Sequence, residues 1–538
     1  MNANNLIKRA ESIASLEFQC SLNKLKGWQL GLVLGEALME DIAPDWQRTN
    51  ESRKQNKQAY YLSMEFLIGR MIFNNLYCAG VLEETDRLLK AQGIDLRILE
   101  DLEDYAFGNG GLGRLAACYL DSAAAHDIPL MGYGLRYKFG LFKQSFVDAR
   151  QAEQPDNWSE FGDPFSIRRY DLRLIISLGD ESVIAVPYDL PIIGYEKNSI
   201  GTLRLWQTEA LQEVDFKLFN TQQYEEAAAA KNKAEDLCKF LYPNDSGDEG
   251  KLLRIKQEYL LSSASMQDIL RSFRAIHGND YASLPSFAAL QLNDTHPAMA
   301  IPELIRLLEA YGVDFYTAFQ IARNTFSYTN HTVMSEALEK WEARLLKQAV
   351  PQIFPIIRRI NQMLLHELKR PDLSLVKNQR VNMADLSIYA THTTNGVAQI
   401  HSQILKDSLF SDWYSVYPER FTNITNGITQ RRWLALCNPQ LSELITKTLE
   451  HDEYIYKLET LRDGLSKIDD SLAQDFIKVK ALKKQELAKH IYQLEGIQIP
   501  PHFVFDVQIK RMHEYKRQLM NALSIMAIYQ GLKDGSIT

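Results

Sequence analysis

The sequence predicts an α/β protein built on a parallel sheet. Short apolar segments are each followed by a polar, turn-prone cluster and then by helical periodicity. This order of strand, loop and helix is the repeating unit of parallel sheets. Ligands of such sheets bind beyond the carboxyl ends of the strands, so we expect the polar clusters to line one crevice. The four segments that show this order are 287–292, 326–328, 386–390 and 503–509.

The remaining elements are predicted from periodicity and composition. Four further regions have helical patterns: 1–50, 99–105, 115–125 and 440–495. After His331, apolar residues recur at spacings of three, four and four, which predicts one helical face through Leu338, Trp341, Leu345 and Ala349. A polar loop near residue 425 marks a change of domain, which predicts one domain over 1–425 and a second over 426–538.

Composition excludes several classes of function. The 538 residues include 60 basic and 68 acidic side chains, and the net charge of −8 disfavours binding to nucleic acids or anionic membranes. No apolar run approaches the roughly 18 residues of a membrane span, and the N-terminus has no signal-peptide core. Five widely spaced cysteines without a Cys-x-x-Cys pair favour a reducing compartment and no zinc site. We expect a cytoplasmic protein without a metal centre.

A glycine-rich loop precedes the helix predicted over 115–125. Residues 108–114 contain the spacing G-x-G-x-x-G, which also occurs in dinucleotide-binding proteins. That function requires a strand before the loop, and the acidic stretch in that place does not have a strand pattern. Two interpretations remain open. The loop presents backbone amides to an anion at the start of a helix, or it provides the small residues of a tight helix contact.

The densest basic cluster follows the last apolar segment. Four permanent cations within eight positions, at the end of a predicted buried strand, suit a phosphate clamp. The alternative is a solvated basic turn of a helix. The cluster consists of Lys510, Arg511, His513, Lys516 and Arg517.

Uncharged polar residues dominate the other clusters. His331 is a candidate base or a donor to a substrate, although a single histidine is more often a satisfied core residue. Asp294 and His296 leave the same alternatives open, and Asn426 beside a glycine also suits a turn. Donors and acceptors at several strand ends suit a polyhydroxyl ligand, and the cations suit phosphate. We therefore infer a site for a sugar and a phosphate.

Together these residues resemble the α-glucan phosphorylases, the family of the glycogen, starch and maltodextrin enzymes. The resemblance runs along nearly the whole chain, and its motifs occur in family order. The motifs are YYLSMEFL at 60–67, GNGGLGRLAACYLD at 108–121, LYPND at 241–245, NDTHPAMAIPEL at 293–304, YTNHTVMSEAL at 328–338, TNGITQRRW at 425–433 and DVQIKRMHEYKRQ at 506–518.

The resemblance implies a fold and a reaction. The fold is a two-domain GT-B-like architecture with an essentially complete, doubly wound N-terminal domain and a C-terminal nucleotide-fold domain that is only begun. The reaction transfers the terminal glucosyl unit of an α-1,4-glucan to inorganic phosphate and gives α-glucose 1-phosphate with retained configuration. The cofactor is pyridoxal 5′-phosphate, whose phosphate group performs the acid–base work. The implied partners are glycogen or maltodextrin, phosphate and a second copy of the chain.

The resemblance also assigns roles to individual residues. His331 matches the histidine that binds the glucose 6-hydroxyl, Asp294 lies near it, and Asn426 matches an asparagine on the sugar hydroxyls. The implied phosphate ligands are Lys510, Arg511 and Lys516. The implied cofactor contacts are Asn109, Gly110, Gly111, Arg432, Trp433 and Lys510.

Three departures from the family qualify this assignment. Gln430 stands where the family has proline, and glutamine fits a turn or helix start there. Residues 246–248 replace a more apolar part of the family's gating loop, so inherited loop regulation is not expected. The family's cofactor lysine lies in a Gly-Thr-Gly-Asn-Met-Lys block that these 538 residues do not contain. We therefore expect a chain truncated within its second domain. The alternatives are an inactive fragment or glucan-binding remnant, and a nucleotide-sugar glycosyltransferase of similar shape.

Overall fold

The computed structural model describes residues 1–510, 512 and 516–537. They form two compact units, Met1–Cys437 and Asn438–Thr538, each with its own architecture. The domain boundary predicted near residue 425 stays a prediction.

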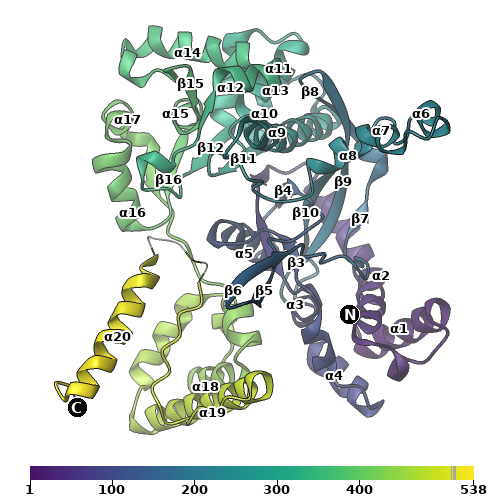
Figure 1. The fold of residues 1–538 in the computed structure, drawn as a ribbon, viewed down its shortest axis with the longest axis vertical. Coiled ribbons are helices and arrows are strands. Elements are labelled where there is room, and N and C mark those ends of the chain that lie inside the picture. The colour runs from purple at the N-terminus through teal and green to yellow at the C-terminus, as the bar shows by residue number, and fades with distance from the viewer. Residues whose placement is uncertain (511, 513–515, 538) are drawn as a thin grey trace. The chain divides into compact units, whose positions relative to one another are not determined.

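The first unit is built on one ten-stranded sheet (Figure 1). Every neighbouring pair from β17 to β10 is parallel, and an antiparallel edge follows, which confirms the predicted α/β class. In spatial order the strands are β17 (Phe421–Asn423), β16 (Thr393–Gly396), β12 (Phe326–Thr329), β11 (Ala288–Asn293), β1 (Gln58–Leu62), β4 (Leu130–Leu135), β10 (Ile200–Ala210), β9 (Glu181–Ile193) and β7 (Ile167–Arg168), while β8 (Leu174–Leu178) also pairs with β9.

The order of the strands reverses between β1 and β11. The chain first adds β4 and β10 on one side of β1, and later adds β11, β12, β16 and β17 on the other. The strands run parallel, with Leu62 opposite Leu292 and Asn293 opposite Thr329, so their carboxyl ends lie at one edge. A doubly wound sheet binds its ligand outside the carboxyl ends at such a switch point.

Helices cover both faces of this sheet. The two helices α1 and α2 confirm the helical pattern of residues 1–50, and α5 confirms the helix predicted over 115–125 but begins four residues earlier. The helices of the first unit are α1 (Ala3–Glu17), α2 (Gly27–Arg53), α3 (Met71–Cys78), α4 (Leu82–Ala91), α5 (Gly111–Ala125), α6 (Phe216–Asn220), α7 (Tyr224–Ala227), α8 (Ala229–Asp236), α9 (Asp248–His277), α10 (Leu284–Phe287), α11 (Ala300–Ala310), α12 (Phe315–Thr325), α13 (Ala343–Ala349), α14 (Phe354–Leu368), α15 (Met383–Tyr389), α16 (Gln399–Ile404) and α17 (Ser411–Val416).

Small antiparallel sheets flank the main one. They pair β2 (Phe66–Gly69) with β3 (Tyr105–Phe107), β5 (Lys143–Val147) with β6 (Arg150–Gln154), and β15 (Arg380–Asn382) with both β13 (Lys340–Glu342) and β14 (Val376–Lys377). The acidic stretch over 99–105 is a short 3₁₀ helix that ends at Asp101 and is followed by β3, so the helical prediction there is only half correct.

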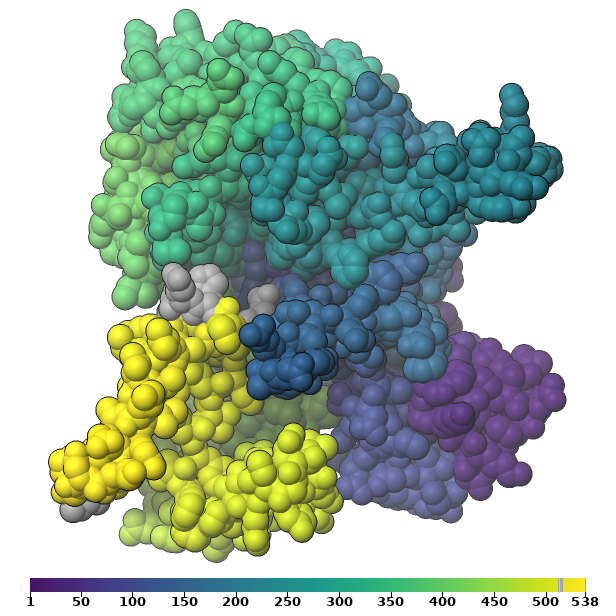
Figure 2. Space-filling view, viewed as in Figure 1, coloured from purple at the N-terminus to yellow at the C-terminus, as the bar shows by residue number. Residues whose placement is uncertain are grey.

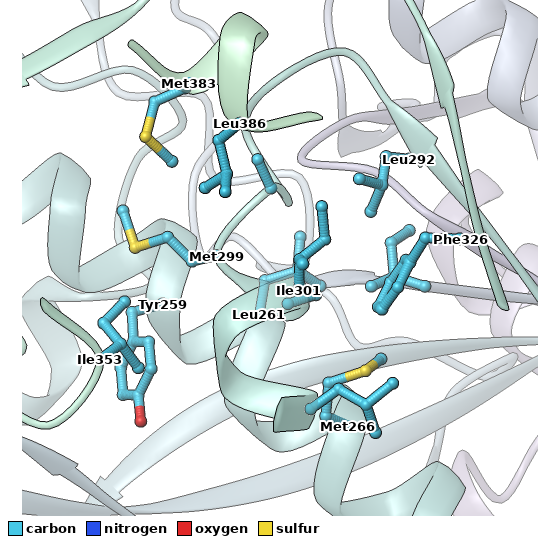
Figure 3. Close-up of a cluster of buried hydrophobic side chains, with 14 of the residues drawn as sticks. Tyr259, Leu261, Met266, Leu292, Met299, Ile301, Phe326, Ile353, Met383 and Leu386 are labelled. Atoms are coloured by element: carbon cyan, nitrogen blue, oxygen red, sulfur yellow. The ribbon is translucent and has the colours of Figure 1, made fainter. Parts of the chain in front are cut away.

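The core lies where α9 and α11 pack on β11 and β12. Figure 3 shows Leu292 and Phe326 of these strands facing Leu261 of α9 and Ile301 of α11, and all four side chains are fully buried. Strands covered on both faces carry apolar residues at successive positions, because neither face meets water. This burial fixes the strand ends that carry the polar residues of the site.

Two predicted elements of the first unit are wrong. Residues 386–390 were expected as a strand but lie in and just after α15, and the strand of this region, β16, covers part of the expected loop. A short apolar run that is buried all round has the same composition in a helix and in a strand. The helix expected after His331 is broken into a 3₁₀ turn, β13 and α13, because Trp341 pairs with Val381 across two strands.

The second unit is helical, as predicted for residues 440–495. It contains α18 (Pro439–Leu449), 3₁₀ turns, α19 (Asp470–Glu495) and α20 (Gln518–Asp534). The strand predicted over 503–509 does not form, and Val504 and Ile509 are 94% and 89% exposed. A strand depends on hydrogen bonds from a neighbour, and the described part of this unit contains no other strand.

A helical segment projects from the surface of the first unit. Figure 2 shows α6 and α7 standing out from the body of the unit, and Phe216 and Tyr224 are exposed there. Among the residues that the structure describes, every helix is too short or too polar to cross a membrane.

Candidate functional site

Polar side chains that follow β1, β11 and β12 meet at the switch point of the sheet. The loop after β1 contributes Ser63 and Glu65, β11 ends with Asn293 and is followed by Asp294, and His331 comes two residues after β12. His331 Nε2 lies 2.7 Å from Asn293 Oδ1. Asn293 Nδ2 donates to Ser63 Oγ at 2.9 Å and to the carbonyl of Leu112 at 3.4 Å. The structure thus brings together two of the predicted residues, Asp294 and His331, through a third that sequence reasoning missed.

His331 is a neutral imidazole at neutral pH. Burial lowers its pKa below the ordinary 6.5, because the cation would lose its hydration. The nearby His401 and His296 lower the pKa further, while the carboxylates of Asp294 and Glu65 raise it by less than the burial lowers it. A neutral imidazole presents one N–H donor and one acceptor, which suits a hydroxyl ligand.

Asp294 is held in an unusual backbone conformation. Its φ is +64°, a left-handed value that few residues other than glycine adopt and that aspartate tolerates better than most. Its N–H donates to the carbonyl of Thr329 at 3.0 Å, and its Oδ1 accepts from the N–H of Thr295 at 2.8 Å. These bonds fix the carboxylate at the strand end next to β12.

A polar cavity of about 410 Å³ opens beside these strand ends. Its volume lies in the usual range for small-molecule sites, about 300–1,000 Å³. The residues after β11 and β12 contribute Asp294, Thr295, His296 and Thr332, and the opposite wall includes Arg254, Glu339 and Trp341.

One arginine at the wall of this cavity, Arg254, pairs with three carboxyl groups, those of Asp245, Glu339 and Glu258. Arg254 Nη2 lies 3.2 Å from Glu339 Oε1 and 3.9 Å from Glu258 Oε1, and Trp341 Nε1 donates to Glu258 Oε2 at 3.1 Å. Burial, and then the neighbouring Glu339, raise the pKa of Glu258 well above its ordinary value. Sequence reasoning missed these residues, because Glu258 lies inside a long helix and gives no local signal.

The glycine-rich loop provides the tight contact that the sequence left open as one alternative, and its role towards an anion stays a prediction. A Cβ at Gly108 would lie 2.9 Å from backbone atoms of Phe66 and Leu67, and one at Gly113 would lie 2.9 Å from Glu65 Cβ, so these glycines are required for packing. A Cβ at Gly111 would meet nothing within 4 Å. The first amides of α5 have no partner within the helix, so this open end favours an anion. The strand before the loop, β3, is antiparallel to β2, which does not match a dinucleotide-binding unit.

Glu65 links the glycine loop to Tyr242, whose ring lies 5.7 Å from that of His296 in the cavity wall. Its Oε2 accepts from the N–H of Asn109 at 2.9 Å, and its Oε1 accepts from the hydroxyl of Tyr242 at 2.6 Å. Glu65 is 4% exposed, so both bonds are needed to satisfy its buried carboxylate. No local pattern around Glu65 indicates this role.

An ion pair and hydrogen bonds hold the segment around Arg431–Leu436 (η9) against α5. Arg431 Nε and Nη2 donate to Asp121 Oδ2 at 3.0 and 2.7 Å, and the arginine side chain is 1% exposed. Thr429 Oγ1 lies 2.6 Å from Cys118 Sγ. This fastening positions the two predicted cofactor residues that follow, Arg432 and Trp433.

The guanidinium nitrogens of Arg432 donate hydrogen bonds to the segment from β2 to α3. Nη1 and Nη2 donate to the carbonyls of Ile68 and Arg70 at 2.5 and 2.9 Å, and Nε donates to Asn74 Oδ1 at 3.1 Å. Burial, and then the cation of Arg114, lower the pKa of Arg432 to about 10. The Arg114 guanidinium lies 5.4 Å from the centre of the Trp433 ring, which is itself 58% exposed.

The other predicted residues are not brought into this cluster by any described contact. Asn426 is exposed, and its N–H donates to the carbonyl of Val397 at 2.9 Å, beside the end of β16. Lys510 and Lys516 belong to the second unit, where the Lys510 carbonyl accepts from Gln518 Nε2 at 3.1 Å. Arg511 and His513 lie outside the described residues, so the phosphate clamp stays a prediction. No group of three His, Cys, Asp or Glu among the described residues is placed to hold a metal ion.

The fold and the site define an α/β protein with a small polar cavity at the carboxyl ends of its parallel strands. The model of the family described as Carbohydrate phosphorylase matches residues 89–538. The chain belongs to the carbohydrate phosphorylase family. This confirms the resemblance seen in the sequence.

Curated relatives support the same assignment. The chain is 39% identical to the muscle form of glycogen phosphorylase from Oryctolagus cuniculus, over 93% of this chain and 64% of the relative. It is 42% identical to the H isozyme of α-glucan phosphorylase from Triticum aestivum, over 93% of this chain and 65% of the relative. The chain therefore spans a little under two thirds of the length of these relatives.

Replacing Arg431 by methionine is expected to destabilise the first unit strongly. The change leaves the carboxylate of Asp121 without its main partner in a buried place, which costs about 3–5 kcal/mol. The measurement is the free energy of unfolding in urea. Arg87→Met is the matched control, because its pair with Glu84 on α4 is exposed and screened by water, so its stability should stay close to that of the parent. Equal losses for the two variants would contradict the role of Arg431.

The two kinds of glycine in the loop predict opposite results. Gly108→Ala is expected to lower the free energy of unfolding by about 1–3 kcal/mol, because the added methyl group collides with the backbone of β2. Gly111→Ala has open space for the methyl group and keeps the backbone amide, so its stability should match or exceed that of the parent. Chemical unfolding of both variants tests this contrast, and a stable Gly108→Ala protein would refute it.

The lowered pKa of His331 predicts a loss of stability in acid. Between the folded pKa and the ordinary 6.5 the unfolded chain binds more protons than the folded chain, so the free energy of unfolding falls as the pH falls through this window. The groups facing His331 are Asp294, His296, His401 and Glu65. The stability of the parent relative to His331→Gln should decline from pH 7.5 towards pH 5, a range chosen to span about two units around the ordinary histidine pKa.

The control for this pH profile is His126→Gln, at an exposed position just after α5. Its stability should run parallel to that of the parent across the same range. A parallel profile for His331→Gln as well would show that His331 is not held neutral by burial.

Proposed function

We propose that the protein is an α-1,4-glucan phosphorylase that transfers a terminal glucosyl unit to inorganic phosphate and forms α-glucose 1-phosphate with retention. The observation that carries the proposal is the cluster of His331, Asn293 and Asp294 beside a 410 Å³ polar cavity at the switch point of the sheet. Membership of the carbohydrate phosphorylase family supports it, as do relatives named glycogen phosphorylase and α-glucan phosphorylase.

Different residues bind different parts of the ligands, the sugar hydroxyls and the phosphate groups. The neutral imidazole of His331 and the carboxylate of Asp294 orient sugar hydroxyls, and Asn426 adds an amide after β17. The amides at the start of α5 bind a phosphate group. Lys510 and Lys516, with Arg511 outside the described residues, are phosphate ligands by the family resemblance alone, and cations of this kind offset repulsion between phosphates.

The residues at the start of α5 fit a pyridoxal phosphate. Gly111 leaves open space beside the free amides, and the Trp433 ring, with Arg114 near its centre, offers an exposed aromatic surface to a planar group. When bound, the cofactor supplies a phosphate that exchanges a proton with the substrate phosphate. In the family a lysine binds the cofactor covalently, and the motif that contains this lysine is absent from these 538 residues. The same family resemblance leads us to propose a cytoplasmic protein that pairs with a second copy.

The first test is binding of maltoheptaose and α-glucose 1-phosphate to the purified chain by calorimetry. His331→Ala is expected to weaken sugar binding about tenfold, because it removes one hydrogen bond of about 1.4 kcal/mol. His126→Ala, which is remote and exposed, should bind like the parent. Unchanged binding by His331→Ala would contradict the proposed site.

The second test is turnover. The chain is fused to the part of the wheat relative that it does not span, supplied with pyridoxal phosphate, and assayed with maltoheptaose and phosphate. Release of glucose 1-phosphate supports the proposal. Consumption of UDP-glucose without phosphorolysis would instead indicate a nucleotide-sugar glycosyltransferase.

A further inference from the structure

We infer that Asn293 is a positioning residue that fixes His331 as the Nε2–H tautomer, so that the site presents a bare Nδ1 to its ligand. The inference rests on the proposed function only for the identity of the ligand. It goes beyond that function because it assigns a role to a residue outside the predicted set. The hydrogen bonds that support the inference come from the loop after β1, the end of β11 and the start of α5.

The orientation of the Asn293 amide follows from its two other partners. The carbonyl of Leu112 only accepts hydrogen bonds, so the group that faces it at 3.4 Å is the amide nitrogen. The hydroxyl of Ser63 donates to the carbonyl of Glu65 at 2.7 Å, which leaves its oxygen to accept from Asn293 at 2.9 Å. Both contacts require Nδ2 on the same side. Oδ1 therefore faces His331.

The amide oxygen then determines the tautomer. Oδ1 has no hydrogen, and it lies 2.7 Å from His331 Nε2, so Nε2 carries the proton. Because burial keeps the imidazole neutral, Nδ1 is left as an acceptor. Asn293 is 0% exposed, so water does not compete for these bonds.

The charged and titratable neighbours do not offer a stronger partner for Nε2. Asp294 and His296 follow β11, His401 belongs to α16, and Glu65 follows β1. Glu65 is engaged by Asn109 and Tyr242, and Asp294 Oδ1 by Thr295. The nearest bonding partner of the imidazole is thus the amide.

This arrangement sets which ligand group the site accepts. A bare Nδ1 binds a hydroxyl that donates, and rejects a group that only accepts, such as a C–F bond. A buried acceptor left without a donor costs about 1–3 kcal/mol, which is roughly a 5- to 150-fold loss of affinity. Leu112 lies in the first turn of α5, so one amide also connects the proposed phosphate-binding helix end to the residue that contacts the sugar.

The test is a long-range proton–nitrogen correlation spectrum of the chain labelled with ¹⁵N-histidine, assigned with His331→Gln. The expected spectrum shows His331 with a protonated Nε2 and an unprotonated Nδ1. Asn293→Leu, which is close in volume, should shift the signals towards the other tautomer or a mixture. Asn293→Asp should keep Nε2–H and raise the pKa of His331, because a carboxylate then faces the ring.

A matched control separates this role from loss of packing. Asn75→Leu also replaces a buried asparagine, at 3% exposure on α3, and should leave the His331 signals unchanged. A parent spectrum of the Nδ1–H form, or an Asn293→Leu spectrum identical to that of the parent, would overturn the inference. A change of the His331 signals in Asn75→Leu equal to that in Asn293→Leu would overturn it as well.

Ligand binding distinguishes failure of the inference from failure of the proposed function. The parent should bind α-glucose 1-phosphate at least fivefold more tightly than its 6-deoxy-6-fluoro analogue, the low end of the range expected from an unpaired acceptor, and Asn293→Leu should reduce this ratio. If the tautomer is as expected but neither sugar binds, the proposed function fails and the positioning role stands. If both sugars bind equally to the parent, the inference fails even though a sugar site exists.

Discussion

The parallel pairing of β1 with β11 is the constraint on which the rest of the site depends. Leu62 lies opposite Leu292, so the chain leaves both strands at the same point of the edge. The strands added on either side then move away in opposite directions, which opens space above this point. Ser63 and Asn293 are 230 positions apart in the chain, and only this pairing brings them within hydrogen-bonding distance.

Burial then decides the chemistry of the residues that meet there. A buried polar group must find a hydrogen-bond partner. The donors and acceptors of each partner then determine the orientation or the protonation of the next group in the chain of bonds. The carbonyl of Leu112 orients the amide of Asn293, whose oxygen then accepts the hydrogen bond from Nε2–H of His331. The same burial that requires these bonds lowers the pKa of the imidazole and keeps it neutral. The result is a site that suits hydroxyl groups more than anions, beside a helix end that suits anions.

The sequence could predict what local patterns encode. The polar clusters after β11 and β12, with Asp294 and His331, were found because each follows an apolar strand directly. Asn293 and Glu65 were not found, since their importance comes from contacts across the sheet and across the glycine loop. The run over 386–390 was misassigned because complete burial removes the periodicity that distinguishes a helix from a strand. Residues 503–509 have the composition of a buried strand, but composition supplies no neighbour to pair with.

The adjacent arginines of η9 show how the fold generates positive charge near the start of α5. Arg431 is neutralised by Asp121, whereas Arg432 donates only to carbonyl and amide oxygens. Among the described residues no carboxylate lies within salt-bridge distance of Arg432 or of Arg114, and the repulsion between these two cations contributes to the lowered pKa of Arg432. A phosphate at the helix end would relieve this repulsion as well as satisfy the free amides. The half-buried guanidinium groups of Arg114 and Arg432 thus support the proposed phosphate site from within the first unit, independently of the basic run at 510–517.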